Sequence, residues 1–136
     1  MDSHDIDPSA VTPNLPSIID EVTTQFEAYE RALVSNDIGA LDEFFWRSDD
    51  VVRFGIGENL YGSEAIAAYR RSVPPGQYLS RSLVKTVVAT FGTDTATVSA
   101  EFVEDNGAVS RQSQTWIRLA DGWRIVAAHV SLMAAS

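Results

Sequence analysis

The sequence predicts an α+β fold in which N-terminal helices pack into the concave face of a strongly curved, mainly antiparallel sheet. Two patterns indicate it. The first third of the chain carries apolar residues at helical spacing, and the last part carries four long strand patterns joined by short turns. Strands this long must curve in a small domain, so helices on the concave side would turn the sheet into a cone with an open end.

Length and composition are those of one globular domain. The chain has 136 residues, of which 45% are hydrophobic, and we expect a flexible tail over 1–15 followed by a domain over 16–136. The start "MDSHDIDPSAVTPNLP" has neither the basic nor the apolar part of a signal peptide, and no apolar run is long enough for a membrane span. We therefore expect a cytoplasmic protein with no membrane partner.

The charge balance points to the class of partner. The formal net charge is −9, from 19 acidic and 10 basic residues, which argues against binding nucleic acid. Nine of the ten basic residues are arginines. A codon bias would explain this, but the guanidinium fork also matches a carboxylate with two parallel hydrogen bonds. A small anionic partner fits this composition.

Helical spacing predicts a first helix over "PSIIDEVTTQFEAYERALV", which begins near Pro16 and ends at Asn36–Asp37. Its inward stripe consists of Ile18, Val22, Phe26, Tyr29 and Leu33. A second, short helix follows in "DIGALDEFFW", capped by Asp37.

The segment "DVVRFGIGENLYG" begins as a strand, in which alternation places Arg53 on the same face as Val51. If both faces are covered, the guanidinium is buried and needs a negative partner. That partner is either a ligand or an acid of the chain, namely Asp49, Glu30 or Glu58.

The glycine-rich remainder, "GIGENLYG", is predicted to be a loop, and its Asn59 is a candidate at the rim of a pocket. A helix is predicted from about Ser63 and ends before Pro74–Pro75–Gly76. Four strands complete the chain, joined by the hairpin turns "GTD", "DNG" and "ADG": Ser80–Phe91, Thr95–Glu104, Ala108–Leu119 and Trp123–Met133.

The last strand offers the one histidine outside the tail. Regular alternation places His129 and Ser131 on the face that lines the cone. The opposite, wholly apolar face then consists of Val126, Ala128, Val130 and Leu132. There His129 would donate to a ligand or move a proton near neutral pH, and the alternative is a half-buried histidine bonded to a carbonyl.

The strand before it, "SRQSQTWIR", is polar on both faces, with Arg111 on one and Gln112 on the other. An antiparallel strand with one wet face has only alternate polar residues. One face therefore borders a wet pocket or a subunit contact, unless the strand end emerges into solvent. With no cysteine, one usable histidine and no Walker or dinucleotide motif, we expect neither a metal nor a cofactor.

The order and length of these elements resemble the NTF2-like (SnoaL-like) superfamily. Three segments together resemble its AtzH-like family over about Val22–Met133: "TTQFEAYERALVSNDIGALDEFFW", "VVRFGIGENLYG" and "SRQSQTWIRLADGWRIVAAHVSLM". This resemblance implies a cofactor-independent amidohydrolase, decarboxylating or not, that converts 1,3-dicarboxyurea to allophanate in cyanuric acid catabolism. The functional tyrosine and arginine of the family fall on Tyr29 and Arg53.

The resemblance and the residues together suggest roles. Arg53 would hold one substrate carboxylate, and a second arginine would hold the other: Arg71, Arg81 or Arg111. Tyr29 would act as acid or base at the scissile C–N bond or its water, while His129 or Ser131 orients the substrate. This interpretation requires Tyr29 and Arg53 to meet in the cavity, where the cation favours phenolate, and no acid of the chain to neutralise Arg53.

Two other functions compete. The segment "QTWIRLADGWRIVAAHVS" also resembles the association domain of calcium/calmodulin-dependent kinases, which implies a non-catalytic ligand-binding or oligomerisation module. A steroid- or polyketide-type isomerase or cyclase ranks third, because it usually needs a carboxylate in the cone. We expect a homodimer, since the long sheet has a predicted apolar back face to cover.

Overall fold

The structure is a computed structural model that describes residues 10–76 and 81–134. It contains three helices and six strands: α1 (Pro16–Val34), α2 (Ile38–Phe44), β1 (Val52–Phe54), β2 (Asn59–Tyr61), α3 (Ser63–Ser72), β3 (Arg81–Phe91), β4 (Thr95–Glu104), β5 (Val109–Leu119) and β6 (Gly122–Leu132). Most of the predicted tail, residues 1–9, lies outside the described residues, and so does Ser80, the predicted start of the first of the four long strands.

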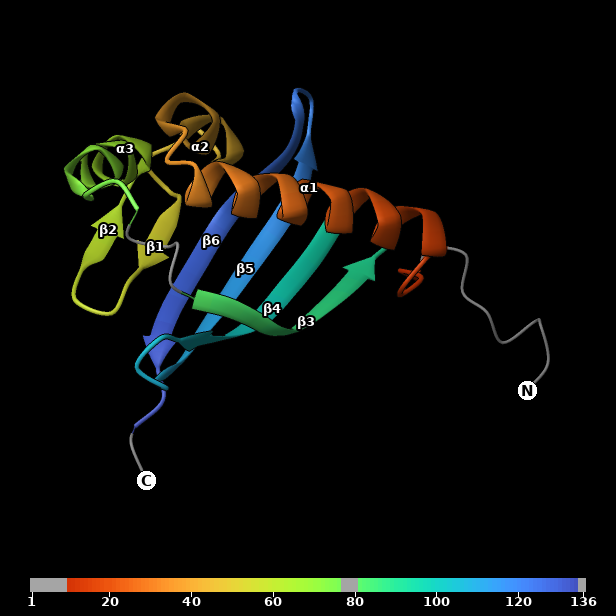
Figure 1. Ribbon diagram of the computed structural model, residues 1–136. Coiled ribbons are helices and arrows are strands. Elements are labelled where there is room, and N and C mark those ends of the chain that lie inside the picture. The colour runs from red at the N-terminus through yellow and green to blue at the C-terminus, as the bar shows by residue number, and fades with distance from the viewer. Residues whose placement is uncertain (1–9, 77–80, 135–136) are drawn as a thin grey trace.

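All six strands form one mixed sheet in the order β2-β1-β6-β5-β4-β3. Every neighbouring pair is antiparallel except β1 and β6, which run parallel. Helix α1 lies across one face of the sheet, and α2 and α3 lie beside β1 and β2 at one end (Figure 1). The predicted cone, with helices on the concave face of a curved sheet, is confirmed.

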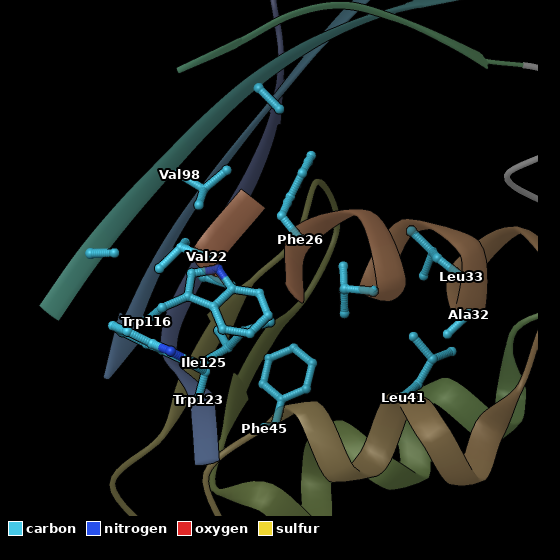
Figure 2. Close-up of a cluster of buried hydrophobic side chains, with 14 of the residues drawn as sticks. Val22, Phe26, Ala32, Leu33, Leu41, Phe45, Val98, Trp116, Trp123 and Ile125 are labelled. Carbon is cyan, nitrogen blue, oxygen red and sulfur yellow. The ribbon is translucent and has the colours of Figure 1, made fainter. Parts of the chain in front are cut away.

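The stripe predicted on α1 forms the helical side of the core. Val22 is fully buried, and Phe26 and Tyr29 are almost so. Trp116 and Ile125 face them from the sheet, with Phe45 beside them (Figure 2). Burying one such side chain contributes about 1.5–3 kcal/mol, so this cluster holds α1 against the sheet. Truncating Phe26 to alanine would cost about 3–5 kcal/mol.

Local sequence sets the ends of the helices. Pro16 opens α1 at a position where its missing N–H is not needed. The Asp37 carboxylate accepts a hydrogen bond from the Ala40 N–H at 3.2 Å, which confirms the predicted cap of α2. Val73 is extended (ψ 128°) because it precedes Pro74, and α3 therefore ends at Ser72.

The prediction of a loop throughout "GIGENLYG" is wrong for Asn59–Tyr61, which form β2. This strand pairs antiparallel with β1, and the Gly55 N–H donates to the Glu58 carbonyl at 2.8 Å across the turn between them. Strands of three residues are too short to show alternation, and only the pairing reveals them.

The predicted faces of the last strand are wrong beyond its middle. Trp116 pairs with Ile125 but Thr115 pairs with Ala127, so Val126 is an extra residue, a β-bulge. The bulge exchanges the two faces: Trp123 and Ile125 are buried before it, and Ala128 is buried after it.

His129 is therefore exposed on the convex face, in one row with Ser99 and Ser113, and Ser131 shares that face. The residues expected to form an apolar back face, Ala128 and Val130, face the helices instead. Within the described part of the chain, no helix is both long and apolar enough to cross a membrane.

Candidate functional site

A small cavity of about 90 Å³ opens between the C-terminal half of α1, strand β1, helix α3 and the sheet. Its described polar lining consists of Arg53, Glu58, Tyr69, Arg81 and Gln112, and its apolar lining of Leu33, Ile56 and Val130. Two cationic forks in a space this small favour a small ligand with negative charge.

Arg53 is held in this cavity by β1. Its side chain is buried, as predicted, and Nη1 donates to Glu58 Oε1 at 3.0 Å. The guanidinium carbon lies 5.3 Å from the centre of the Tyr69 ring, a cation–π contact. The expectation that no acid of the chain neutralises Arg53 is wrong, because Glu58 on the β1–β2 turn reaches back to it.

The position of Glu58 depends on the glycines before it. Its Oε2 accepts a hydrogen bond from the Gly57 N–H at 3.2 Å. A Cβ on Gly55 would overlap the Glu58 carboxylate, so only glycine lets that side chain fold back over the turn. The "GIGE" segment therefore places the anion on Arg53.

Arg81 is the second arginine of the cavity. Its Nη2 donates to Glu30 Oε1 at 2.8 Å, and its guanidinium carbon lies 3.8 Å from the centre of the Phe102 ring. Of the three arginines predicted as a second carboxylate anchor, it is the one that lines the cavity. Arg71 is exposed and pairs with Asp42 at 2.9 Å, and Arg111 is exposed on the convex face because alternation from buried Gln112 turns it outward.

Glu30 holds a largely buried carboxylate against Arg81, behind the described lining of the cavity. Burial raises its pKa, and the charge of Arg81 and the nearby Gln112 amide oppose this shift. Gln112 Nε2 donates toward the Glu30 carboxylate, although the contact lies outside strict hydrogen-bond geometry, so this donor and acceptor face each other. Sequence reasoning considered Glu30 only as a counter-ion of Arg53. The polar character of β5 predicted a wet pocket or a subunit contact on one of its faces, and Gln112 of this strand lines the cavity.

Tyr29 does not meet Arg53 as predicted. It is 3% exposed, and its ring packs edge-on against Phe44 and Phe45. Its hydroxyl accepts a hydrogen bond from Arg70 Nη2 at 3.4 Å. The cation beside the phenol is therefore Arg70 of α3. Neither residue is part of the described cavity lining, which α1 reaches one helical turn after Tyr29, at Leu33.

Arg70 was not singled out from the sequence, because nothing separates it from the other arginines there. Its side chain is 2% exposed, and Nη1 has no hydrogen-bond partner. A buried cation with so few partners is costly, and such groups are typical of functional sites.

The other predicted site residues lie outside the cavity. His129 is exposed and packs edge-on against Phe54, with ring centres 5.8 Å apart. Ser131 shares its convex face, and Asn59 is exposed on β2. Within residues 10–76 and 81–134, no group of three histidine, aspartate or glutamate side chains is placed to bind a metal.

The sequence matches a known protein family. Residues 11–136 match the model of the AtzH-like family. A cystatin-like fold protein from Burkholderia xenovorans LB400 is 52% identical, with a TM-score of 0.87, over 93% of this chain and 99% of that one. A protein of unknown function of the DUF3225 family, from Pectobacterium atrosepticum SCRI1043, is 45% identical, with a TM-score of 0.86, over 95% and 99% of the two chains.

A more distant structure shows the fold alone. An NTF2-like protein of unknown function from Pseudomonas putida KT2440 is 17% identical, with a TM-score of 0.72, over 86% of this chain and 87% of that one. No curated protein matches the sequence significantly. The match over 11–136 and the shared architecture lead to one conclusion: the chain belongs to the AtzH-like family, and its fold is that of NTF2-like proteins.

Proposed function

We propose that this protein is a cofactor-independent hydrolase of small carboxylated ureas, such as 1,3-dicarboxyurea, which it converts to allophanate. The observation that carries the proposal is the pair of arginines, Arg53 and Arg81, in one small cavity. Membership of the AtzH-like family supports it. A urea with two terminal carboxylates offers one anionic group to each fork.

Substrate binding would be an exchange of carboxylates. Glu58 already accepts from Arg53 in the way that a substrate carboxylate would. Glu58 is carried by a turn, and its side chain is 23% exposed, so it has room to swing outward. A substrate carboxylate that takes its place keeps the charge of the cavity unchanged.

In the proposed reaction, the bond between one urea nitrogen and its terminal carboxyl carbon breaks. The electron pair stays on the nitrogen, which takes up a proton. The carboxyl group leaves as carbon dioxide, or as bicarbonate when water supplies both that proton and a hydroxide. Tyr29, the tyrosine that the family resemblance identifies, is the proposed acid or base. Its hydroxyl is bound to Arg70 outside the cavity lining, so in this proposal the phenol acts once it has turned toward the bound substrate.

Turnover of freshly prepared 1,3-dicarboxyurea, followed by carbon NMR, tests the proposal. We expect Arg53→Ala and Tyr29→Phe to lose at least about 100-fold in kcat/KM, and Arg53→Lys to be nearly as damaging as Arg53→Ala because lysine lacks the fork. The control is Arg71→Ala, which removes an exposed arginine outside the cavity. Full activity of Arg53→Ala, or no turnover by the wild type, would contradict the proposal.

The second candidate is a non-catalytic module that binds a small anion. The internal ion pairs favour it, because Glu58 and Glu30 already satisfy part of each guanidinium and hold it rigid. This candidate predicts saturable binding of small carboxylates without product formation in the same NMR experiment.

A further inference from the structure

Two of the contacts that hold Arg53 come from elements of different rigidity. Glu58, which accepts from Nη1 at 3.0 Å, stands on the short turn between β1 and β2, where Gly55 and Gly57 precede it. Tyr69, whose ring centre lies 5.3 Å from the guanidinium carbon, stands on helix α3. A glycine-rich surface turn yields to a ligand more readily than a packed helix does.

Helix α3 is fixed to the rest of the fold on both sides of Tyr69. Arg70, the next residue, is 2% exposed and donates to the Tyr29 hydroxyl at 3.4 Å. Ile66, three residues earlier, is buried in the hydrophobic core, and Ser72 Oγ donates to the Tyr69 carbonyl at 2.6 Å. The half-buried ring of Tyr69 is therefore carried by a well-anchored backbone at the point where it lines the cavity.

A ring face and a carboxylate hold a guanidinium in different ways. The carboxylate accepts from N–H groups, whereas the ring attracts the cation through its quadrupole and accepts from none of them in its plane. A ligand carboxylate that binds Arg53 must take the place of Glu58, but it does not need the place of Tyr69. The contact with the ring can therefore persist in the complex.

We propose that Tyr69 is a positioning residue that keeps the Arg53 fork in the cavity when Glu58 gives way to the ligand carboxylate. A long side chain that loses its ion pair regains rotamer entropy, and a second contact on a rigid element opposes that loss of order. The contribution comes from the ring and not from the hydroxyl. This inference rests on the proposed function in that it takes the same cavity as the substrate site.

Calorimetry with ureidoacetate tests the inference, because this small urea has one carboxylate and no carboxyl group on nitrogen to lose. Tyr69→Phe keeps the ring and should bind within about twofold of the wild type, whereas Tyr69→Leu should bind about tenfold more weakly. Tyr61→Leu changes an exposed tyrosine of β2 and is the matched control, with wild-type affinity expected. Wild-type affinity in Tyr69→Leu, or no binding by the wild type, would overturn the inference.

Fluorination separates the charge distribution of the ring from its shape. Tyr69→Phe and Tyr69→pentafluorophenylalanine place rings of similar shape at this position, but the fluorines withdraw electrons from the ring face and abolish its attraction for a cation. We expect the fluorinated protein to bind ureidoacetate at least about fivefold more weakly than Tyr69→Phe. Equal binding would mean that the ring only fills space, and would overturn the inference even if Tyr69→Leu fails to fold.

Glu58→Gln provides a readout that packing alone would not change. With Tyr69 in place, removing the competing charge should tighten ureidoacetate binding about fivefold. In the Tyr69→Leu background the same change removes both of these contacts from Arg53, and we expect no gain. A loss of packing at position 69 would weaken binding by the same factor with or without Glu58, so additive effects would contradict the assigned role.

Failure of this inference can be told apart from failure of the proposed function, because binding of ureidoacetate needs no turnover. Ring-dependent binding without turnover of 1,3-dicarboxyurea would reject the reaction and keep the inference. Turnover of 1,3-dicarboxyurea by Tyr69→Leu with the KM of the wild type would reject the inference and keep the reaction.

Discussion

Glu58 is the residue on which the behaviour of Arg53 depends. It pairs with Arg53 at 3.0 Å and would have to leave for a substrate carboxylate to bind. Removing its charge takes away the competitor, so Glu58→Gln should lower KM for an anionic substrate about fivefold, equivalent to about 1 kcal/mol. Steady-state kinetics measure this.

Gly55→Ala tests independently whether Glu58 competes with the substrate for Arg53. The added Cβ would overlap the Glu58 carboxylate and push it off Arg53, while every charge in the protein is kept. We expect KM to fall as in Glu58→Gln. A rise in KM with both variants would mean that Glu58 positions Arg53 for the substrate and does not compete with it.

Glu30 predicts a particular dependence of stability on pH. Burial raises its pKa above the ordinary value of 4.5, so the folded state binds this proton more tightly than the unfolded state. The free energy of unfolding therefore falls as pH rises from about 4.5 through the raised pKa, and Glu30→Gln should remove that decrease. Urea denaturation across this pH range measures it.

The comparison must use the difference between wild type and variant, because another carboxylate acts in the opposite direction. Hydrogen bonds from Trp123 and Arg118 lower the pKa of Glu21, whose contribution is lost as pH falls. Glu27→Gln, on the exposed side of α1, is the control. A pH profile of Glu30→Gln that parallels the wild type would contradict the assignment.

At the scale of elements, the bulge at Val126 decides which face of β6 enters the core. Because of the bulge, Ala128 faces the core and Ala127 lies on the exposed convex face. Ala128→Asp should therefore lose at least about 2 kcal/mol of unfolding free energy, because it buries a carboxylate that has no partner. Urea denaturation measures the loss.

Ala127→Asp is the control, since it places the same carboxylate on the exposed face of the strand. It should cost well under half as much. If both variants were equally stable, the bulge would not determine the register of the strand.

The same bulge shows what the sequence predicts and what it does not. Repeating patterns over many residues fix the helix α1 and place the bounds of β3–β6 within about a residue of those observed, because each pattern is sampled several times along its element. One inserted residue leaves no periodic trace, so His129 and Ser131 were placed on the wrong face. β2 was missed for a related reason, since three residues do not make a pattern.

The candidate site also has features that the sequence pattern predicts and features that it does not. Burial of Tyr29 and Arg53 follows from alternation and helical spacing, and the structure confirms it. Their partners do not follow from spacing, because Arg70 reaches Tyr29 and Glu58 reaches Arg53 through side-chain directions set by tertiary packing. Local patterns thus predict which groups are buried, and only the assembled fold decides which groups meet.

At the scale of the whole molecule, the convex face of the sheet is the surface on which we expect a homodimer to form. Its centre carries small side chains, Ser99, Ser113 and Ala127, which allow a flat approach. A neighbouring row consists of Lys85, Glu101 and Arg111, whose alternating charges would complement a second copy related by a two-fold axis.

Light scattering of the wild type should give twice the chain mass of 14.9 kDa. Ser113→Arg would place two cations against each other at the centre of the face, and we expect it to give the monomer mass. A monomeric wild type, or a variant that stays dimeric, would place the interface elsewhere or exclude it.

The parallel pairing of β1 with β6 has a consequence for how the protein is made. During synthesis on the ribosome, the segment that carries Arg53 emerges long before the strand that will support it, so an early nascent chain cannot complete the cavity. Until β6 arrives, β1 can pair only with β2, a hairpin too short to be stable alone. Completion of the cavity should therefore be among the last events of folding, and, if the proposed function holds, a stalled chain that lacks β6 should bind no small carboxylate.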